Sequence, residues 1–363
     1  MPLSAVKSTK PKYLALAESL RRQICSGALK PGDRLPSQAE LRARYGISQA
    51  TMERLHAHLE QDGLIVRKQG LGTFVAHPPR PQRKGIIGVS GQGFLQDRES
   101  FYWSRILDGI LAEATPAGFQ ILLVDRAHQD IVADKVDGII TNTPHHPIAV
   151  LPTAGLPYVA LVTAVSTHDN VVANDFEGGW LLTRHLQSLG HERIAVLMNL
   201  GDEPSGRRVA GYRAAMQSAG IDVDERWVRM IPDLWPRFID NGRAEITRWL
   251  AEDWDELKCT AVLVYNDQTA IGVIDGLGDA GLSVTGDVSV TGFDATGLFD
   301  YRPPLLTSIE VPLEEIGRQA MRLFLERIDG SDAPIRQVEI PVRLRLGEST
   351  SAVVEKRAAM TVA

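Results

Sequence analysis

Polar and basic side chains that could bind nucleic acid cluster between Arg34 and Gly70 of this 363-residue chain. Gln49 could pair with an adenine edge through two hydrogen bonds, and Arg54 could read a guanine or bind a phosphate. Arginine and lysine side chains around them suit contacts to the DNA backbone, which position a protein without reading sequence. The residues expected to face DNA are Arg34, Ser37, Arg44, Ser48, Gln49, Ala50, Thr51, Arg54, Lys68, Gln69 and Gly70.

Three short helices and a hairpin are expected to position these side chains. Apolar residues recur at helical spacing in three consecutive stretches, each ending beside a glycine. Ser37 followed by Glu40 forms a capping box at the start of the second stretch, and Ser48 precedes the third. A helix-turn-helix places its last helix in the major groove, and a basic hairpin beside it forms a wing. The predicted elements are helices over 12–26, 37–46 and 48–62, and strands over 64–66 and 73–75.

The charge of the chain is divided between two regions. Residues 1–84 carry fifteen Lys and Arg against six Asp and Glu, whereas the remaining residues carry 24 basic and 39 acidic side chains. A basic head on an acidic body favours a polyanion that binds the head alone. The alternative, solvated charges on a small helical domain, does not account for the caps and the wing.

The motifs PGDRLPS, YGISQAT, LEQDGLI and GLGTFV, all within residues 31–75, resemble the DNA-binding domain of the GntR family of bacterial transcription regulators. That family usually carries arginine at the positions of Gln49 and Glu53. Two fewer cations weaken phosphate binding and change the bases that are read. The resemblance therefore implies a winged helix-turn-helix on double-stranded DNA, with an operator sequence of its own.

The rest of the chain alternates short apolar runs with amphipathic stretches, after a proline-rich, basic linker over 77–84. Such alternation is typical of parallel sheets covered by helices, here an α/β fold in two lobes. Ligands of open parallel sheets bind at the carboxyl ends of the strands, so a cleft between the lobes is the expected site. The predicted strands are 86–90, 120–124, 138–141, 158–162, 194–200, 261–265 and 288–293, and the predicted helices are 103–116, 177–189, 207–219, 243–257, 268–280 and 313–328.

The motifs VANDFEGG, RVAGYRAAM, AVLVYNDQTAIGVIDGL and DVSVTGFD resemble the effector-binding core of the lactose/galactose-repressor family, which is similar to periplasmic sugar-binding proteins. A GntR-type head on this core resembles arabinose-repressor-type regulators. The combined resemblance implies a ligand-responsive transcriptional regulator, most simply a repressor. It also implies a homodimer on a palindromic operator and an effector that is a sugar, a sugar derivative or a nucleoside.

The resemblance also places the effector contacts. Carboxylates accept hydrogen bonds from paired hydroxyls, an arginine donates a fork, and an aromatic ring stacks on a sugar or base face. The alternatives are that Asp267 caps a helix, that Asp294 caps a turn, and that the aromatic residues pack in the core. The residues implied as effector contacts are Tyr102, Trp103, Arg208, Trp235, Asn266, Asp267 and Asp294.

Other classes of function find little support in the sequence. The segment from Gly276 to Gly281 matches GxGxxG, but it ends a helix instead of opening one, so no dinucleotide cofactor is expected. We expect no metal, no catalytic residues, no membrane insertion and a cytoplasmic location; a solute-binding protein or an α/β enzyme using the same cleft remains the alternative. The predicted domains are a DNA-binding domain over 1–76, a linker over 77–84, an effector-binding and dimerisation domain over 85–350 and a flexible tail over 351–363.

Overall fold

The computed structural model divides into two compact units, Met1–Arg83 and Lys84–Ala363. The boundary falls inside the proline-rich segment of 77–84. The structure describes residues 12–25, 29, 32–68, 71–76, 83–91, 101–124, 135–142, 156–232, 237–297, 300–331 and 333–353.

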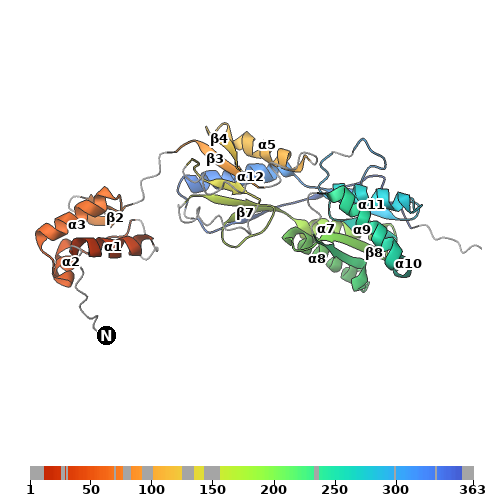
Figure 1. The fold of residues 1–363 in the computed structure, drawn as a ribbon, viewed down its shortest axis with the longest axis horizontal. Coiled ribbons are helices and arrows are strands. Elements are labelled where there is room, and N and C mark those ends of the chain that lie inside the picture. The colour runs from red at the N-terminus through yellow and green to blue at the C-terminus, as the bar shows by residue number, and fades with distance from the viewer. Residues whose placement is uncertain are drawn as a thin grey trace, which may run out of the picture. The chain divides into compact units, whose positions relative to one another are not determined.

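The first unit contains three helices and a hairpin, as expected (Figure 1). The Ser37 hydroxyl accepts from the Glu40 amide at 3.2 Å, and the Glu40 carboxylate accepts from the Ser37 amide at 2.7 Å, which confirms the capping box. Gly46 ends the second helix with φ 59°, a left-handed conformation that glycine adopts without steric cost. The elements are α1 (Lys12–Cys25), α2 (Gln38–Tyr45), α3 (Gln49–Gln61), β1 (Ile65–Lys68) and β2 (Gly72–Val75).

A single apolar cluster joins these elements. Met52, Leu55 and Leu59 project from α3 and are fully buried. Strands β1 and β2 pair antiparallel, with Ile65 opposite Val75. The strands are longer than predicted, because Arg67 and Lys68 continue the ladder instead of belonging to the turn.

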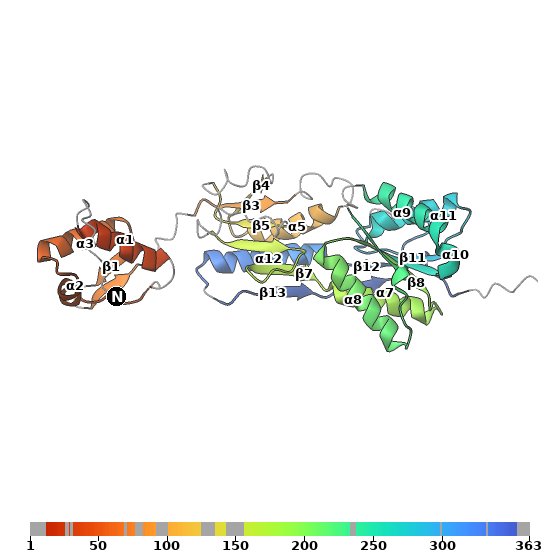
Figure 2. The same ribbon diagram turned by 60° about the horizontal axis from the view of Figure 1, so that its bottom comes forward.

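The second unit consists of two lobes, each built on a parallel sheet (Figures 1 and 2). Lobe one has six strands in the order β13-β7-β6-β5-β3-β4, and helices α5 and α12 pack against each other beside it. The elements of lobe one are β3 (Ile86–Ser90), α5 (Tyr102–Ala114), β4 (Gln120–Val124), β5 (Ile139–Thr141), β6 (Tyr158–Leu161), β7 (Asp169–Ala173), α12 (Leu313–Ile328) and β13 (Gln337–Ile340).

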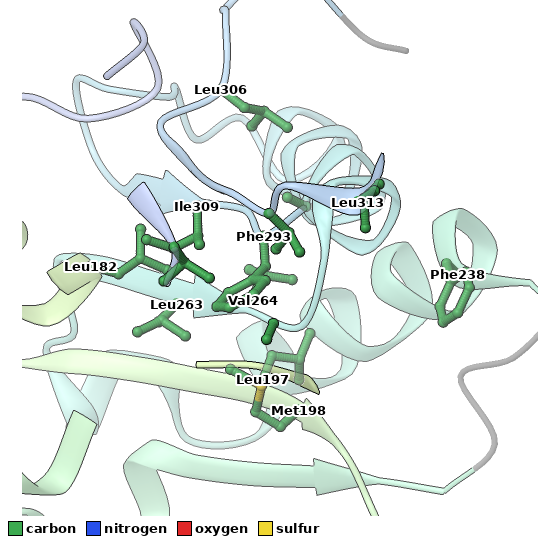
Figure 3. Close-up of a cluster of buried hydrophobic side chains, with 14 of the residues drawn as sticks. Leu182, Leu197, Met198, Phe238, Leu263, Val264, Phe293, Leu306, Ile309 and Leu313 are labelled. Carbon is green, nitrogen blue, oxygen red and sulfur yellow. The ribbon is translucent and has the colours of Figure 1, made fainter. Parts of the chain in front are cut away.

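Lobe two has four strands in the order β11-β10-β8-β9, with α7 packed on α8 and α9 packed on α11. Figure 3 shows part of its core, where Leu197, Leu263 and Ile309 gather around Phe293. The elements of lobe two are α7 (Asp175–Ser188), β8 (Ile194–Asn199), α8 (Glu203–Ser218), a short 3-10 turn (Glu225–Trp227), β9 (Val228–Ile231), α9 (Phe238–Glu252), α10 (Trp254–Leu257), β10 (Ala261–Val264), α11 (Asp267–Asp279), β11 (Ser289–Thr291), β12 (Ser308–Glu310) and β14 (Arg343–Arg345).

The described chain passes between the lobes after β7, before α12 and after β13. Strands β12 and β14, which adjoin two of these passages, pair antiparallel with Ile309 opposite Leu344. Several connected segments therefore join the lobes, an arrangement that permits a hinge motion without separating them.

The sequence interpretation missed strands β7, β9, β12, β13 and β14. It also started α7, α8 and α9 two, four and five residues late. Helix α8, for example, begins at Glu203 because Asp202 caps it and Pro204 fits the first turn.

The predicted tail of 351–363 also needs correction at its start. Ser351 accepts a hydrogen bond from His191 Nε2 at 3.0 Å through its carbonyl oxygen, and the Val353 amide donates to Leu189 O at 2.9 Å. The first residues of this segment are therefore packed against lobe two, and residues 354–363 lie outside the described part.

Candidate functional site

A cavity opens between the two lobes and is lined from both. Its volume is about 110 Å³, whereas roughly 10–15 Å³ suffices for one water by the same kind of measure, so it has room for a small organic ligand. Lobe one contributes Tyr102, Trp103 and Val162, and lobe two contributes Pro204, Arg208, Phe238, Tyr265, Asn266, Gln268 and Asp294.

Strand ends supply several of the polar side chains of this cavity. Asn266 follows β10, Asp294 follows β11, and Arg208 lies on the helix that follows β8. Carboxyl ends of neighbouring parallel strands meet at one edge of a sheet, which is where open α/β folds bind ligands. The sequence order of strands and helices thus brings these residues together.

Arg208 is buried and held on several sides. Its Nε donates to Asp175 Oδ1 at 2.7 Å, its Nη1 donates to the Tyr265 carbonyl, and its guanidinium lies 3.5 Å from the centroid of the Phe293 ring. Burial acts to lower the pKa of Arg208, but the carboxylates of Asp175 and Asp294 outweigh it and raise that pKa. The guanidinium is therefore a permanent, fixed donor at the cavity wall.

Asp294 presents a carboxylate to the same cavity from the loop after β11. Its amide donates to Ile309 O at 2.9 Å, and its φ is 98°, a left-handed value that is rare outside glycine. Backbone of this kind persists where the surroundings fix it, and such positions cluster at ligand sites. Asp294 can accept hydrogen bonds from a bound hydroxyl group.

Aromatic rings supply most of the remaining wall. Tyr102 and Trp103 meet edge to face with centroids 4.9 Å apart, and Phe238 stacks on Tyr265 at 5.7 Å. Burial, aided by nearby carboxylates, raises the pKa of both tyrosines well above the ordinary value, so both hydroxyls stay protonated and neutral. Apolar ring faces beside a few fixed polar groups are typical of sugar and nucleoside sites.

The implied effector contacts do not all reach the cavity. Tyr102, Trp103, Arg208, Asn266 and Asp294 line it. Trp235 lies outside the described residues.

The prediction that Asp267 contacts the effector is wrong, because Asp267 lies behind the cavity wall and does not line the cavity. Asp267 is 5% exposed, and its side chain binds Ser308 instead of lining the cavity. Burial raises the pKa of Asp267 to about 7, against the opposing effect of the Ser308 hydrogen bond. It is also not the cap of α11, since Asn266 Oδ1 accepts from the Thr269 amide at 2.9 Å.

Sequence reasoning did not identify five of the lining residues. Tyr265 and Gln268 lie within two positions of Asn266 in the chain, so they could have been predicted from the motif at the end of β10. Phe238 and Val162 reach the cavity only through the packing of the lobes. The residues not anticipated are Val162, Pro204, Phe238, Tyr265 and Gln268.

The residues expected to face DNA lie on α3, on the hairpin, and on or just before α2 of the first unit. Gln49 Oε1 accepts from Arg42 Nη1 at 3.0 Å, and Gln49 Nε2 donates to Glu53 at 3.1 Å. A base contact by Gln49 therefore requires exchange of these bonds. Ala50 and Arg54 are exposed on the same helix.

The other described residues of this surface have mixed roles. Ser37 and Ser48 cap helices, and the Thr51 hydroxyl lies 2.9 Å from that of Ser48. Arg34 is exposed and lies against the hairpin at Gly72, and Lys68 Nζ lies 5.3 Å from the Phe74 ring centroid. The Arg44 side chain, Gln69 and Gly70 lie outside the described residues.

Among the described residues, no group of three or more His, Cys, Asp or Glu side chains could hold a metal ion. No helix in the described part of the chain is long and apolar enough to cross a membrane.

Each of the two units contains a match to a different known family. Residues 12–75 match the bacterial regulatory proteins of the gntR family. Residues 183–350 match the periplasmic binding protein-like domain.

Individual relatives extend these matches over most of the chain. The arabinose metabolism transcriptional repressor of Geobacillus stearothermophilus is 27% identical over 89% of this chain and 93% of its own. The HTH-type transcriptional repressor PurR of Vibrio campbellii is 31% identical over 67% of this chain and 77% of its own. A LacI family transcriptional regulator from Enterococcus faecium, solved with bound ribose, is 27% identical, with a TM-score of 0.64 over 74% of this chain and 100% of that one.

These relatives are transcriptional regulators, and each matches two thirds or more of this chain. The chain therefore belongs to the bacterial transcriptional repressors that join a gntR-family DNA-binding domain to a ligand-responsive, periplasmic-binding-protein-like domain.

Proposed function

We propose that this repressor acts in the cytoplasm as a homodimer on a palindromic operator, and that a neutral, hydroxyl-rich molecule bound between the lobes controls its DNA affinity. The observation that carries the proposal is the composition of the cavity, with Arg208 and Asp294 set among aromatic rings from both lobes. Two-fold symmetry of a dimer requires two operator half-sites at fixed spacing.

The balance of charge favours a neutral ligand over a phosphorylated one. Among the lining residues that the structure describes, Arg208 is the one cation, and Asp175 already pairs with it. Asp294 adds a negative charge to the wall, and the carboxylate of Asp202 lies close enough to the Tyr265 hydroxyl to raise its pKa. A phosphate group would meet carboxylates without an unpaired cation to offset them.

The relatives suggest the first ligands to test. One is named for arabinose metabolism and another was solved with ribose bound. Arabinose and ribose are both neutral pentoses, which agrees with the charge and the size of the cavity. Nucleosides remain the second class, because the rings of Tyr102 and Trp103 could pack against a base as well as against a sugar.

Contacts between the lobes support closure around the ligand as the control step. Arg207 on α8 of lobe two forms an ion pair with Glu339 on β13 of lobe one. The Ala164 amide, in the β6–β7 connection of lobe one, donates to Glu203 on α8 at 3.4 Å. Since Arg208 adjoins Arg207 on the same helix, ligand contact and lobe contact are linked through α8. A ligand that prefers the closed arrangement shifts the population towards it.

Replacing Glu339 by glutamine is expected to weaken ligand affinity about two- to fivefold, because the variant loses an ion pair that favours closure. The pair is partly exposed, so the effect is modest and shrinks further in high salt. Calorimetric titration with the binding pentose at low and high salt measures it. The matched control is Glu225→Gln, which breaks the Arg213–Glu225 pair inside lobe two and leaves ligand affinity unchanged.

The full chain itself provides the test of the proposed function. Selection from random DNA duplexes, with and without L-arabinose, D-ribose, their phosphates and a nucleoside panel, is expected to enrich a palindrome whose binding changes with a neutral ligand. DNA affinity falls steeply with salt for such a protein. Light scattering is expected to give the mass of a dimer. Failure to enrich any duplex, or a response to the phosphorylated sugars alone, contradicts the proposal.

A further inference from the structure

Asp267 is a buried carboxylate that binds the loop after β11 at several points. Its own amide donates to Phe293 O at 3.0 Å, and its Oδ1 accepts from the Ser308 hydroxyl at 2.6 Å. The amides of Ala295 and Thr296 also lie close enough to the carboxylate to lower its pKa. Asp267 therefore approaches the loop on both sides of Asp294.

The conformation of this loop needs such support. Asp294 and Ala295 have φ values of 98° and 45°, which cost energy in residues other than glycine. A Cβ at Gly292 would lie 2.2 Å from Asp267 Oδ1, so the backbone approaches the carboxylate closely. A side chain at Gly292 would displace the same contacts.

Two groups of the cavity depend on this loop. Asp294 presents its carboxylate from the loop, and Phe293 places its ring against the Arg208 guanidinium at 3.5 Å. Capping of α11 does not require the Asp267 carboxylate, because Asn266 supplies the cap. The hydrogen bonds of Asp267 to the loop and to β12 join its amide to Phe293 O and its carboxylate to Ser308.

We propose that Asp267 is a positioning residue of the ligand site, which sets the orientation of Asp294 and Arg208 through the loop of residues 292–296 without touching the ligand. The proposal rests on the proposed function of the cavity. It assigns to Asp267 a role different from the direct contact that its motif position implies.

The first test needs no ligand. Hydrogen–deuterium exchange of the full chain is expected to show exchange of the 292–296 amides at least tenfold faster in Asp267→Ala than in the unmodified protein. Asp267→Asn keeps one acceptor oxygen and is expected to restore most of the protection. Ser308→Ala removes only the hydrogen bond from Ser308 to Asp267, so this variant is less prone to misfold. An exchange rate between those of the unmodified protein and Asp267→Ala is expected.

The second test measures affinity for L-arabinose and D-ribose by calorimetry. Asp267→Ala is expected to lower affinity at least tenfold, and Asp267→Asn to stay within threefold of the unmodified protein. The matched control is Asp137→Ala in lobe one. Asp137 is a buried carboxylate that accepts from the backbone amides of Lys84, Gly85 and Ile86, but it does not line the cavity. Its loss is expected to lower Tm and leave affinity unchanged.

Unaltered exchange of the loop in Asp267→Ala overturns the inference, as does an equal loss of affinity in Asp137→Ala. Absence of pentose binding by the unmodified chain contradicts the proposed ligand class instead, and the exchange measurement then still decides the role of Asp267.

Discussion

Replacing Asp294 by alanine is expected to lower affinity for the pentose ligand at least 100-fold, while operator affinity in the absence of ligand stays within about threefold. Asp294 lines the cavity with a carboxylate that can accept from two neighbouring hydroxyls. A hydrogen bond to a charged group contributes about 1.5–3 kcal/mol, and each 1.4 kcal/mol is tenfold in affinity. Two such bonds therefore account for a loss of that size. Calorimetry gives the ligand affinity, and a fluorescence titration with labelled operator gives the DNA affinity.

The control for this variant is Asp300→Ala. Asp300 lies further along the same connection and pairs with Arg345 at 2.8 Å, away from the cavity wall. Its removal is expected to leave ligand affinity nearly unchanged. Tight pentose binding by Asp294→Ala would show that the ligand does not use this carboxylate, and with it the charge argument for a neutral, hydroxyl-rich ligand would fail.

Much of the fold follows from local patterns, and the failures have a local cause. The Leu313–Ile328 helix was predicted to the residue, since its apolar positions keep a clear helical period. Strand β7 was missed because it begins with Asp169 and Asn170, which read as loop residues. In the structure both are buried, and Arg327, 158 positions away in sequence, donates two hydrogen bonds to Asp169. A partner so distant cannot be inferred from the strand itself.

In the site, too, motifs predicted individual residues, whereas the pairings between side chains depend on tertiary packing. Family motifs pointed to Arg208, Asn266 and Asp294, and these three do meet at one cavity. No motif indicated that Asp175 would bind Arg208 or that Phe238 would stack on Tyr265. Those pairings arise when α7, α8 and α9 pack around the sheet of lobe two. Motif position also could not distinguish a residue that faces the ligand from one directly behind it, which is why Asp267 was misplaced.

Replacing Arg208 by methionine is expected to abolish ligand binding and also to destabilise the larger unit. The variant leaves Asp175, which is 2% exposed, buried without its partner. Removing one partner of a buried ion pair costs about 3–5 kcal/mol. For a unit of this size, that cost lowers Tm by roughly 10 °C. Circular dichroism during heating measures the change.

The loss of stability in Arg208→Met is expected to depend on pH, and the titration of Asp175 determines whether it grows or shrinks as pH rises. Burial already raises the pKa of Asp175 in the folded chain, against the opposing charge of Arg208. Without Arg208 that pKa rises further, so the folded state favours the protonated acid. A group with a raised folded pKa contributes stability at low pH that is lost as pH rises through that pKa. The deficit of Arg208→Met relative to the unmodified protein should therefore be larger at pH 8 than at pH 5.

Two further variants separate the buried charge from other effects of the substitution. Arg213→Met removes an exposed arginine of the same helix, whose pair with Glu225 is solvated, and little change in Tm is expected. Adding Asp175→Leu to Arg208→Met removes the unpaired carboxyl group, so much of the lost stability should return while ligand binding stays abolished. If the double variant is no more stable than Arg208→Met, the cost arises from lost packing of the Arg208 side chain against Phe293 and Tyr265, and not from the isolated charge.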